Sequence, residues 1–292
     1  MASSRRCVAA LAVCVVAAAI APATALGSEL IGRGATNVRL QVDAQGRATV
    51  SFRSGGAQKS VVASGAVDAR PPSQTQPQVA FKLTFGGATG ANVCRPYTGP
   101  ALAWRIAACT APDGTFWAVQ AWQRALPNYG VAAKPKQAAA ELRLSHWSGP
   151  LAVLEVATDW SYRRFHHLYG RLTYQGGGVF GYRATTAGVP LDSYGRNIYI
   201  DTFGSPYGAG WKRENSFLTH SPTGGFCYGF YAHGKRPPGA GQQYRATVIG
   251  PGVTPDVMWQ GAAPPPYDAA AEAQANDAQR AMLGNDPACK VN

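Results

Sequence analysis

An alternation of apolar and polar residues marks the first third of the chain. Every second residue is apolar from Val38 to Val42 and again from Ala48 to Phe52. Successive side chains of a β-strand point to opposite faces, so each stretch predicts a strand with one buried face. Residues 43–46 lie between the two stretches and are typical of a turn, so the pattern predicts a hairpin.

Short apolar or alternating runs continue through the rest of the chain, and clusters of Gly or Pro separate nearly all of them. The runs lie at 79–85, 116–122, 142–147, 151–156, 165–174, 179–182, 197–203, 226–231 and 244–249. Many short strands with frequent turns predict an all-β fold, either an antiparallel β-sandwich or an open barrel. No repeat of fixed period is present, which argues against a propeller or a solenoid.

The end of the chain predicts a helix. After the prolines at 264–266, Asp268 can cap an Ala-rich helix that runs to Leu283 and ends at Gly284. Residues 137–144 fit a short helix or a strand equally well. We therefore expect a β-rich body over 26–262, with an N-terminal hairpin lobe (26–70) and a Pro-rich connector (71–78). A Pro-rich spacer and helical tail follow over 263–292.

Residues 1–25 have the pattern of a secretory signal peptide. Arg5 and Arg6 precede an apolar stretch, and the small residues 23–25 match a cleavage site after Ala25. The apolar stretch is too short for a membrane anchor, and Val13 is too large for a lipoprotein site before Cys14. The expected location is secreted, extracellular or on the cell envelope, without a membrane-spanning segment in the mature chain. The excess of Arg over Lys, with abundant Ala and Gly, suggests a bacterial source.

Four cysteines remain after the signal is removed. An even number in an oxidising compartment predicts disulfides, and two turn-rich stretches allow Cys94 to pair with Cys109. Cys227 and Cys289 would then form the second pair and attach the C-terminal helix to the β-body. The alternative is a free Cys227 that acts as a nucleophile.

A region rich in aromatic and basic residues, 160–231, is the predicted ligand-binding region. Ile198 and Ile200 would take one face of a strand and leave Tyr199, Asp201 and Phe203 on the other. Stacking and charge-assisted hydrogen bonds on such faces suit a planar or anionic ligand. The alternative is that these aromatic side chains belong to the core. The predicted binding residues are Arg163, Arg164, His167, Tyr169, Arg171, Tyr199 and Phe203.

Catalytic chemistry is less well supported by the sequence. His167, Asp201 and His220 are candidates for a hydrolase of wall or glycan material, but no Gly-x-Ser-x-Gly elbow accompanies them. Glu155 and Asp159 are candidates for the carboxyl pair of a glycosidase. The chain contains no cofactor motif and no spacing typical of a zinc site, so we expect neither group.

The formal net charge of +12 favours a polyanionic partner. The leading hypothesis is a disulfide-stabilised β-protein that binds an acidic or glycan-type polymer of the envelope, with nucleic acid bound only non-specifically. An extracellular hydrolase and a purely structural envelope protein are the alternatives.

Overall fold

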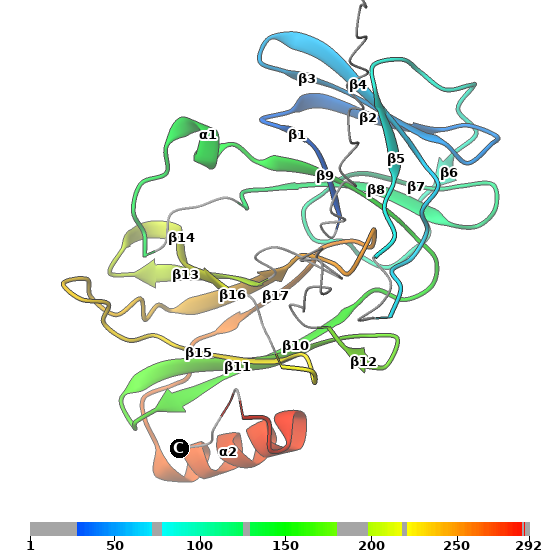
Figure 1. Ribbon diagram of the computed structural model, residues 1–292. Helices are drawn as coiled ribbons and strands as arrows, with labels where there is room; N and C mark the ends of the chain where they lie inside the picture. Colours follow the sequence, from blue (N-terminus) through cyan, green and yellow to red (C-terminus); the bar gives the residue numbers. More distant parts are fainter. Residues whose placement is uncertain are drawn as a thin grey trace, which may run out of the picture.

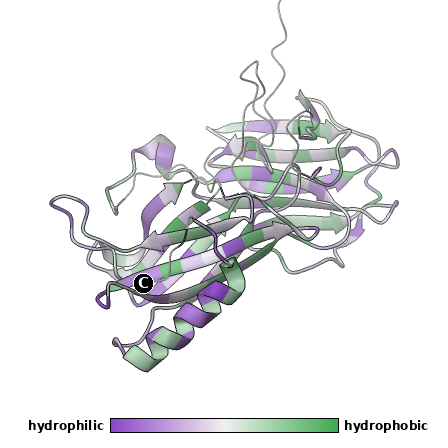
Figure 2. Ribbon diagram, turned by 60° about the horizontal axis from the view of Figure 1, so that its bottom comes forward, coloured by the Kyte–Doolittle hydropathy of each residue, from purple (hydrophilic) through white to green (hydrophobic). Residues whose placement is uncertain are grey.

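A computed structural model describes residues 28–71, 78–124, 129–179, 198–217, 221–287 and Cys289. The predicted signal peptide and His220 lie outside these residues. Antiparallel sheets dominate the fold, as the sequence predicts, and no barrel closes among the described strands (Figure 1). Apolar and polar residues alternate along many of the strands (Figure 2), because one face of each of these strands packs into a core.

The first sandwich contains a five-stranded and a four-stranded sheet. The five-stranded sheet has the order β1 (Glu29–Arg33), β9 (Glu141–Trp147), β8 (Phe116–Trp122), β7 (Arg105–Thr110) and β6 (Arg95–Pro96). The second sheet has the order β2 (Thr36–Val42), β3 (Ala48–Ser54), β4 (Ala57–Ser64) and β5 (Lys82–Phe85). Val50, Phe52 and Trp117 are buried in the core between them. The predicted hairpin is present as β2 and β3, and its lobe shares this core with later strands.

The second sandwich also contains two antiparallel sheets. One consists of β10 (Val153–Ser161), β11 (Phe165–Tyr174), β12 (Gly177–Gly178) and β15 (Gly225–Gly229), with β12 and β15 both paired to β11. The other has the order β14 (Gly208–Phe217), β13 (Ile198–Ser205), β16 (Gln243–Val248) and β17 (Val257–Ala262). Leu168, Ile200 and Phe230 are buried between these sheets.

Helix α2 (Ala269–Leu283) covers the outer face of β10 and β11 (Figure 1). Its N-cap is Asp268, whose Oδ1 accepts the backbone N–H of Ala271 at 2.8 Å, and Gly284 follows with φ of 60°. The ambiguous segment 137–144 divides between two elements. A short helix, α1, covers Pro135–Ala138, and β9 begins at Glu141.

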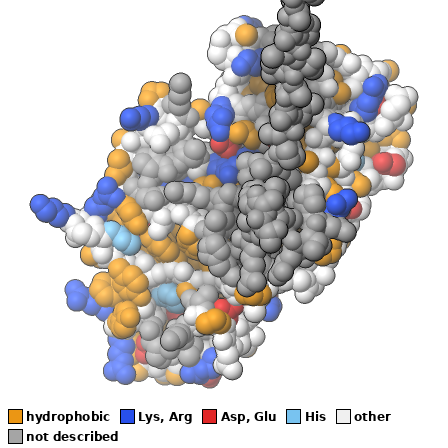
Figure 3. All heavy atoms as spheres, in the orientation of Figure 1, with side chains coloured by type: hydrophobic (Ala, Val, Ile, Leu, Met, Phe, Trp, Pro, Cys, Tyr) orange, Lys and Arg blue, Asp and Glu red, His pale blue; other side chains and the backbone are white. Residues whose placement is uncertain are grey.

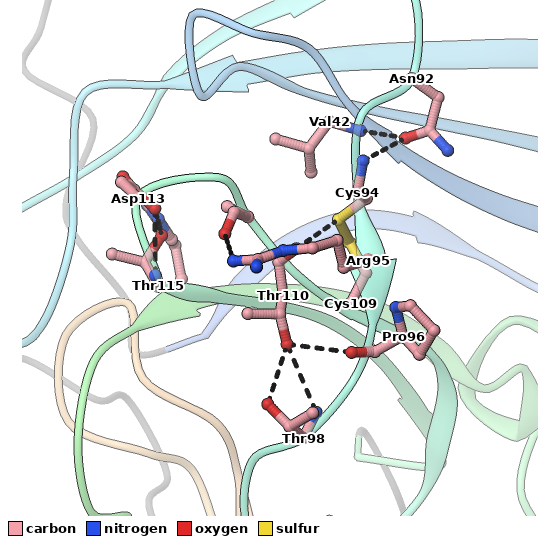
Figure 4. The surroundings of a disulfide bond; sticks show 12 residues. Val42, Asn92, Cys94, Arg95, Pro96, Thr98, Cys109, Thr110, Asp113 and Thr115 are labelled. Carbon is pink, nitrogen blue, oxygen red and sulfur yellow. Dashed lines mark hydrogen bonds between the residues drawn. A yellow bond between two sulfur atoms is a disulfide. The ribbon is translucent and has the colours of Figure 1, made fainter.

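Both predicted disulfides are present. Cys94 and Cys109 join β7 to the segment before β6, with their Cα atoms 5.8 Å apart. Figure 4 shows that Asn92 connects this site to the facing sheet, since its Oδ1 accepts the backbone N–H groups of Val42 and Cys94 at 3.0 and 3.2 Å. Cys227 pairs with Cys289, which attaches the segment after α2 to β15.

A buried polar network joins the two sandwiches. Asp256, just before β17, accepts hydrogen bonds from the Ser28 hydroxyl and from Trp122 Nε1, the latter at 2.7 Å. Gln120 exchanges two hydrogen bonds with the Asp256 backbone, each 2.9 Å long. Such buried groups are stable only when they are hydrogen-bonded, so the network fixes one relative position for the two sandwiches.

Candidate functional site

A cavity of about 400 Å³ opens to solvent where the two sandwiches meet. We call it the junction cleft. One wall comes from the first sandwich and the segment that follows β8, and the other is the outer face of the sheet that contains β13. The lining residues are Trp104, Trp122, Gln123, residues 130–133, Asp201, Trp211, Lys212, Arg213 and Arg245.

Three charged residues at one register position form the floor of the cleft. Asp201 on β13 pairs with Arg213 on β14 and with Arg245 on β16, so all three side chains share the outer face. Arg213 Nε lies 2.5 Å from Asp201 Oδ1, and Arg245 donates from Nη2 and Nε to Oδ2 at 2.9 and 3.1 Å. Two guanidinium groups thus share one carboxylate, which leaves one positive charge uncompensated. Lys212 adds another at the rim.

Two indole rings pack against the Arg245 guanidinium. Its Cζ lies 4.3 Å from the ring centroid of Trp211 and 4.7 Å from that of Trp104. Cation–π contacts of this kind hold the guanidinium in place. Trp104 has φ of 57°, a left-handed conformation that costs a non-glycine residue about 1–2 kcal/mol. Its carbonyl accepts the Ala121 N–H at 3.0 Å, so the main chain holds the ring in this strained position.

The remaining wall of the cleft is attached to β14. The N–H groups of Tyr129 and Gly130 donate to the carbonyls of Glu214 and Arg213, both at 3.0 Å. Arg213 also donates to the carbonyls of Gln123 and Arg124 at 3.3 Å. Arg213 is therefore occupied by structural contacts on both sides, whereas Arg245 provides the cationic group of the cleft.

The structure separates the predicted binding residues into three places. Arg163 and Arg164 are exposed at the turn between β10 and β11. His167, Tyr169 and Arg171 share the outer face of β11, where Tyr169 lies buried at the α2 helix and donates to the Ala275 carbonyl at 3.3 Å. Tyr199 and Phe203 lie on the same strand face as Asp201. These residues do not form a single ligand-binding face.

Two of the predicted ligand contacts lie in the interior. Tyr169 and Tyr199 are only 1% and 2% exposed, so neither ring is available to a ligand at the surface. Tyr199 packs edge-on against Trp122 and accepts a hydrogen bond from Arg124 Nε at 2.8 Å. Burial raises the pKa of the Tyr199 hydroxyl, which therefore stays neutral. Both rings take the core role that the sequence left open as the alternative.

The candidate catalytic residues are also separated. His167 and Asp201 lie on opposite outer faces of the second sandwich, with its core between them. His167 Nδ1 is instead 2.6 Å from Oδ1 of the buried Asp159 on the neighbouring strand. Asp159 and Glu155 are four positions apart on β10, roughly 13 Å along a strand, which exceeds the spacing of a glycosidase carboxyl pair. Glu155 forms an ion pair with Arg171 at 3.0 Å.

Trp104 and Arg245 were missed by the sequence analysis. A partial signal for Arg245 exists, because Tyr244, Ala246 and Val248 alternate as core residues and direct Arg245 to the outer face. Trp104 carries no such signal, since it lies in a connecting segment and its contact with Arg245 depends on how the sandwiches meet.

A second polar cluster lies on the other face of β14. Glu214 is fully buried, and the Tyr228 hydroxyl donates to its Oε1 at 3.2 Å. His233 Nε2 lies 3.8 Å from the same oxygen. Burial raises the pKa of Glu214 to about 7, although hydrogen bonds from Tyr207 and Tyr228 oppose the shift. A Cβ atom at Gly239 would collide with this carboxyl group, so a larger residue there would displace Glu214.

No protein family model matches the chain, and no curated protein or solved structure is similar to it. Within the described residues, no group of three or more His, Cys, Asp or Glu side chains could hold a metal ion. No helix of the described part is long and apolar enough to cross a bilayer. The junction cleft combines an open cavity with a fixed guanidinium group and two indole rings.

Proposed function

We propose that this protein binds an acidic, glycan-type polymer of the cell envelope and holds one anionic sugar unit in the junction cleft. The observation that carries the proposal is the fixed Arg245 guanidinium, held by Asp201 and packed against Trp104 and Trp211 at an open cavity. Indole rings stack on the apolar faces of sugar rings, and cationic groups bind their carboxylates. The volume falls within the range of small-molecule sites.

The charges of the cleft favour an anionic ligand over a neutral one. Asp201 is the one carboxylate among its lining residues, and two arginines already neutralise it. The same fact argues against the hydrolase alternative, since acid–base hydrolysis of a glycoside needs a second carboxyl group across the cleft. Location outside the cytoplasm fits the two disulfides, which persist in oxidising compartments.

Binding of an oligogalacturonate, followed by tryptophan fluorescence, tests the proposal. We expect the fluorescence to change on binding, and the affinity to fall as salt rises, because the contact is between opposite charges. Arg245→Gln should weaken binding about tenfold or more, since a hydrogen bond to a charged group contributes roughly 1.5–3 kcal/mol. Trp211→Ala should weaken it through lost stacking.

Arg39→Gln, at an exposed position of β2 far along the first sandwich, is the matched control for the loss of one positive charge. Arg213 remains on Asp201 in Arg245→Gln, so the carboxylate keeps a partner. Equal binding of the neutral galactose oligomer, or equal affinity of the cleft variants and the control, would refute the assignment of the ligand to the cleft.

A further inference from the structure

The turn between β10 and β11 presents an aromatic residue and two arginines to solvent. Ser161 pairs with Phe165, and the Arg164 N–H donates to the Ser161 carbonyl at 3.2 Å. The residues between them, Tyr162 and Arg163, have φ of 51° and 55°. Asn and Gly are the residues that favour this left-handed geometry in hairpins. Tyr and Arg are strained there, and such strain is typical of functional positions.

An aromatic layer supports this turn from below. The Tyr231 ring lies 6.1 Å from Tyr162 and 5.2 Å from Phe165, and its hydroxyl is 2.6 Å from Ser161 Oγ. The absence of a side chain at Gly229 makes room for the ring, because a Cβ atom there would lie 2.3 Å from it. Tyr162 itself is 73% exposed, so its side chain projects from a rigid base.

Two exposed arginines follow the exposed ring on the same turn. Arg163 and Arg164 are exposed on the turn, and Arg164 also lies over the Phe165 ring at 5.2 Å. Lys235 and Arg236 are exposed in the loop that follows Tyr231, where the Arg236 guanidinium lies over the Tyr129 ring at 5.1 Å. Figure 3 shows a hydrophobic patch bordered by Lys and Arg side chains at the left edge of the molecule, the end at which this turn lies in Figure 1. Two acids lie at the start of α2, where Asp268 caps the helix and Glu272 accepts a hydrogen bond from the Tyr267 hydroxyl.

From this arrangement we infer a second binding surface, the β10–β11 tip, defined by Tyr162, Arg163, Arg164 and Tyr231, that docks on an anionic lipid bilayer. The tip is a turn at the end of two strands and carries a 73% exposed ring, so it fits a flat partner better than a chain, which would need a groove. Tyrosine rings favour the headgroup level of a bilayer, and arginine binds lipid phosphates. The docking surface is separate from the junction cleft and does not depend on the ligand proposed there.

Sedimentation with phosphatidylcholine vesicles, with and without phosphatidylglycerol, measures the binding. We expect association with the anionic vesicles alone, reduced by salt. The double variant Arg163→Gln/Arg164→Gln should lower the partition coefficient about 30-fold, since each basic residue near the membrane contributes about 1 kcal/mol. The control Arg39→Gln/Arg53→Gln removes the same charge from exposed positions of the first sandwich and should retain wild-type binding.

Two further variants test whether the aromatic residue enters the interface. In Tyr162→Trp, the fluorescence of the added tryptophan should shift to the blue and be quenched by brominated lipids. Tyr162→Ser should bind more weakly than Phe85→Ser, which removes a 70% exposed ring from the first sandwich. Equal loss in the two double variants, binding independent of phosphatidylglycerol, or an unshifted Tyr162→Trp spectrum on bound vesicles would overturn the inference.

Discussion

Glu214 is next in sequence to a residue that lines the junction cleft. Its buried carboxyl group, however, lies on the opposite face of β14. Arg213 points to the cleft, and Glu214 points into the cluster of Tyr228, Tyr207 and His233. At this irregular point of the β13–β14 pairing, the Asp201–Arg213 ion pair and a carboxyl group with a raised pKa lie on opposite sides of β14. The backbone carbonyls of both residues also hold the wall of the cleft through Tyr129 and Gly130.

The raised pKa of Glu214 predicts a specific pH dependence of stability. The folded state binds the proton with a pKa of about 7, against 4.5 for an ordinary glutamate. The protonated carboxyl group stabilises the folded state. This contribution is fully present below pH 4.5 and is lost as pH rises through 7, because the unfolded chain releases the proton at a lower pH than the folded state does. The shift corresponds to about 3 kcal/mol, from the relation of 1.36 kcal/mol per pKa unit.

Urea unfolding at pH 5 and pH 8 measures this effect. Glu214→Gln cannot ionise. Its free energy of unfolding should therefore fall less between the two pH values than that of the wild type, by up to about 3 kcal/mol. Glu272→Gln, on the surface helix, is the control and should behave as the wild type. Equal pH dependence of Glu214→Gln and the wild type would show that Glu214 titrates normally.

At the scale of elements, α2 depends on the β-body for its position. The helix is rich in Ala and buries only Gln279 and Leu283, so it has little apolar surface with which to dock. Isolated helices of this length are marginal in water. The Cys227–Cys289 disulfide is thus a main link between the helix and the sheet beneath it. Hydrogen bonds of Tyr169 and Asp286 add to this link.

Removal of this disulfide should loosen α2 before the sandwiches. In Cys227→Ser/Cys289→Ser, we expect amide hydrogen exchange over 269–283 to become faster than exchange in β3 and β8, which open only on global unfolding. The closed loop spans a sequence separation of 62, and the chain-entropy relation gives a loss of about 4 kcal/mol in unfolding free energy. Cys94→Ser/Cys109→Ser is the matched control, for which protection of α2 should stay unchanged. Unaltered exchange of α2 without Cys289 would contradict a stapling role.

At the scale of the whole molecule, the N-terminal strand completes the junction between the sandwiches. Ser28 is buried, and its hydroxyl donates to Asp256 and accepts from Arg143 Nε, the latter at 2.9 Å. Cleavage after Ala25 would leave Ser28 as the third residue of the mature chain. The proposed processing site therefore lies just outside the segment that the fold requires.

We expect mass spectrometry of the native protein to find an N-terminus at Leu26, outside the cytoplasm, because the pattern of residues 1–25 is that of a cleaved signal. A variant with Ala23→Leu and Ala25→Leu should remain unprocessed, whereas Ser3→Ala should be processed normally. An intact chain beginning at Met1 in washed membranes would contradict cleavage and favour an anchor.

The sequence by itself determined the elements and their covalent links. Period-two alternation is a local property, so β2, β3 and the inward residues of β11 and β13 could be predicted from neighbouring positions. The cap at Asp268 and the glycine after the helix are equally local. The disulfides could be predicted because four cysteines allow few pairings.

Only the tertiary structure decided which outward faces meet solvent. Tyr199 and Phe203 share a strand face, yet Tyr199 is buried against Trp122 while Phe203 is partly exposed. The junction cleft combines Trp104 of one sandwich with Arg245 of the other, and no periodicity links positions so far apart in the chain. A local pattern specifies the direction of a side chain relative to its own sheet. What covers that side chain depends on long-range packing, here fixed by the buried contacts of Asp256 with Ser28, Gln120 and Trp122.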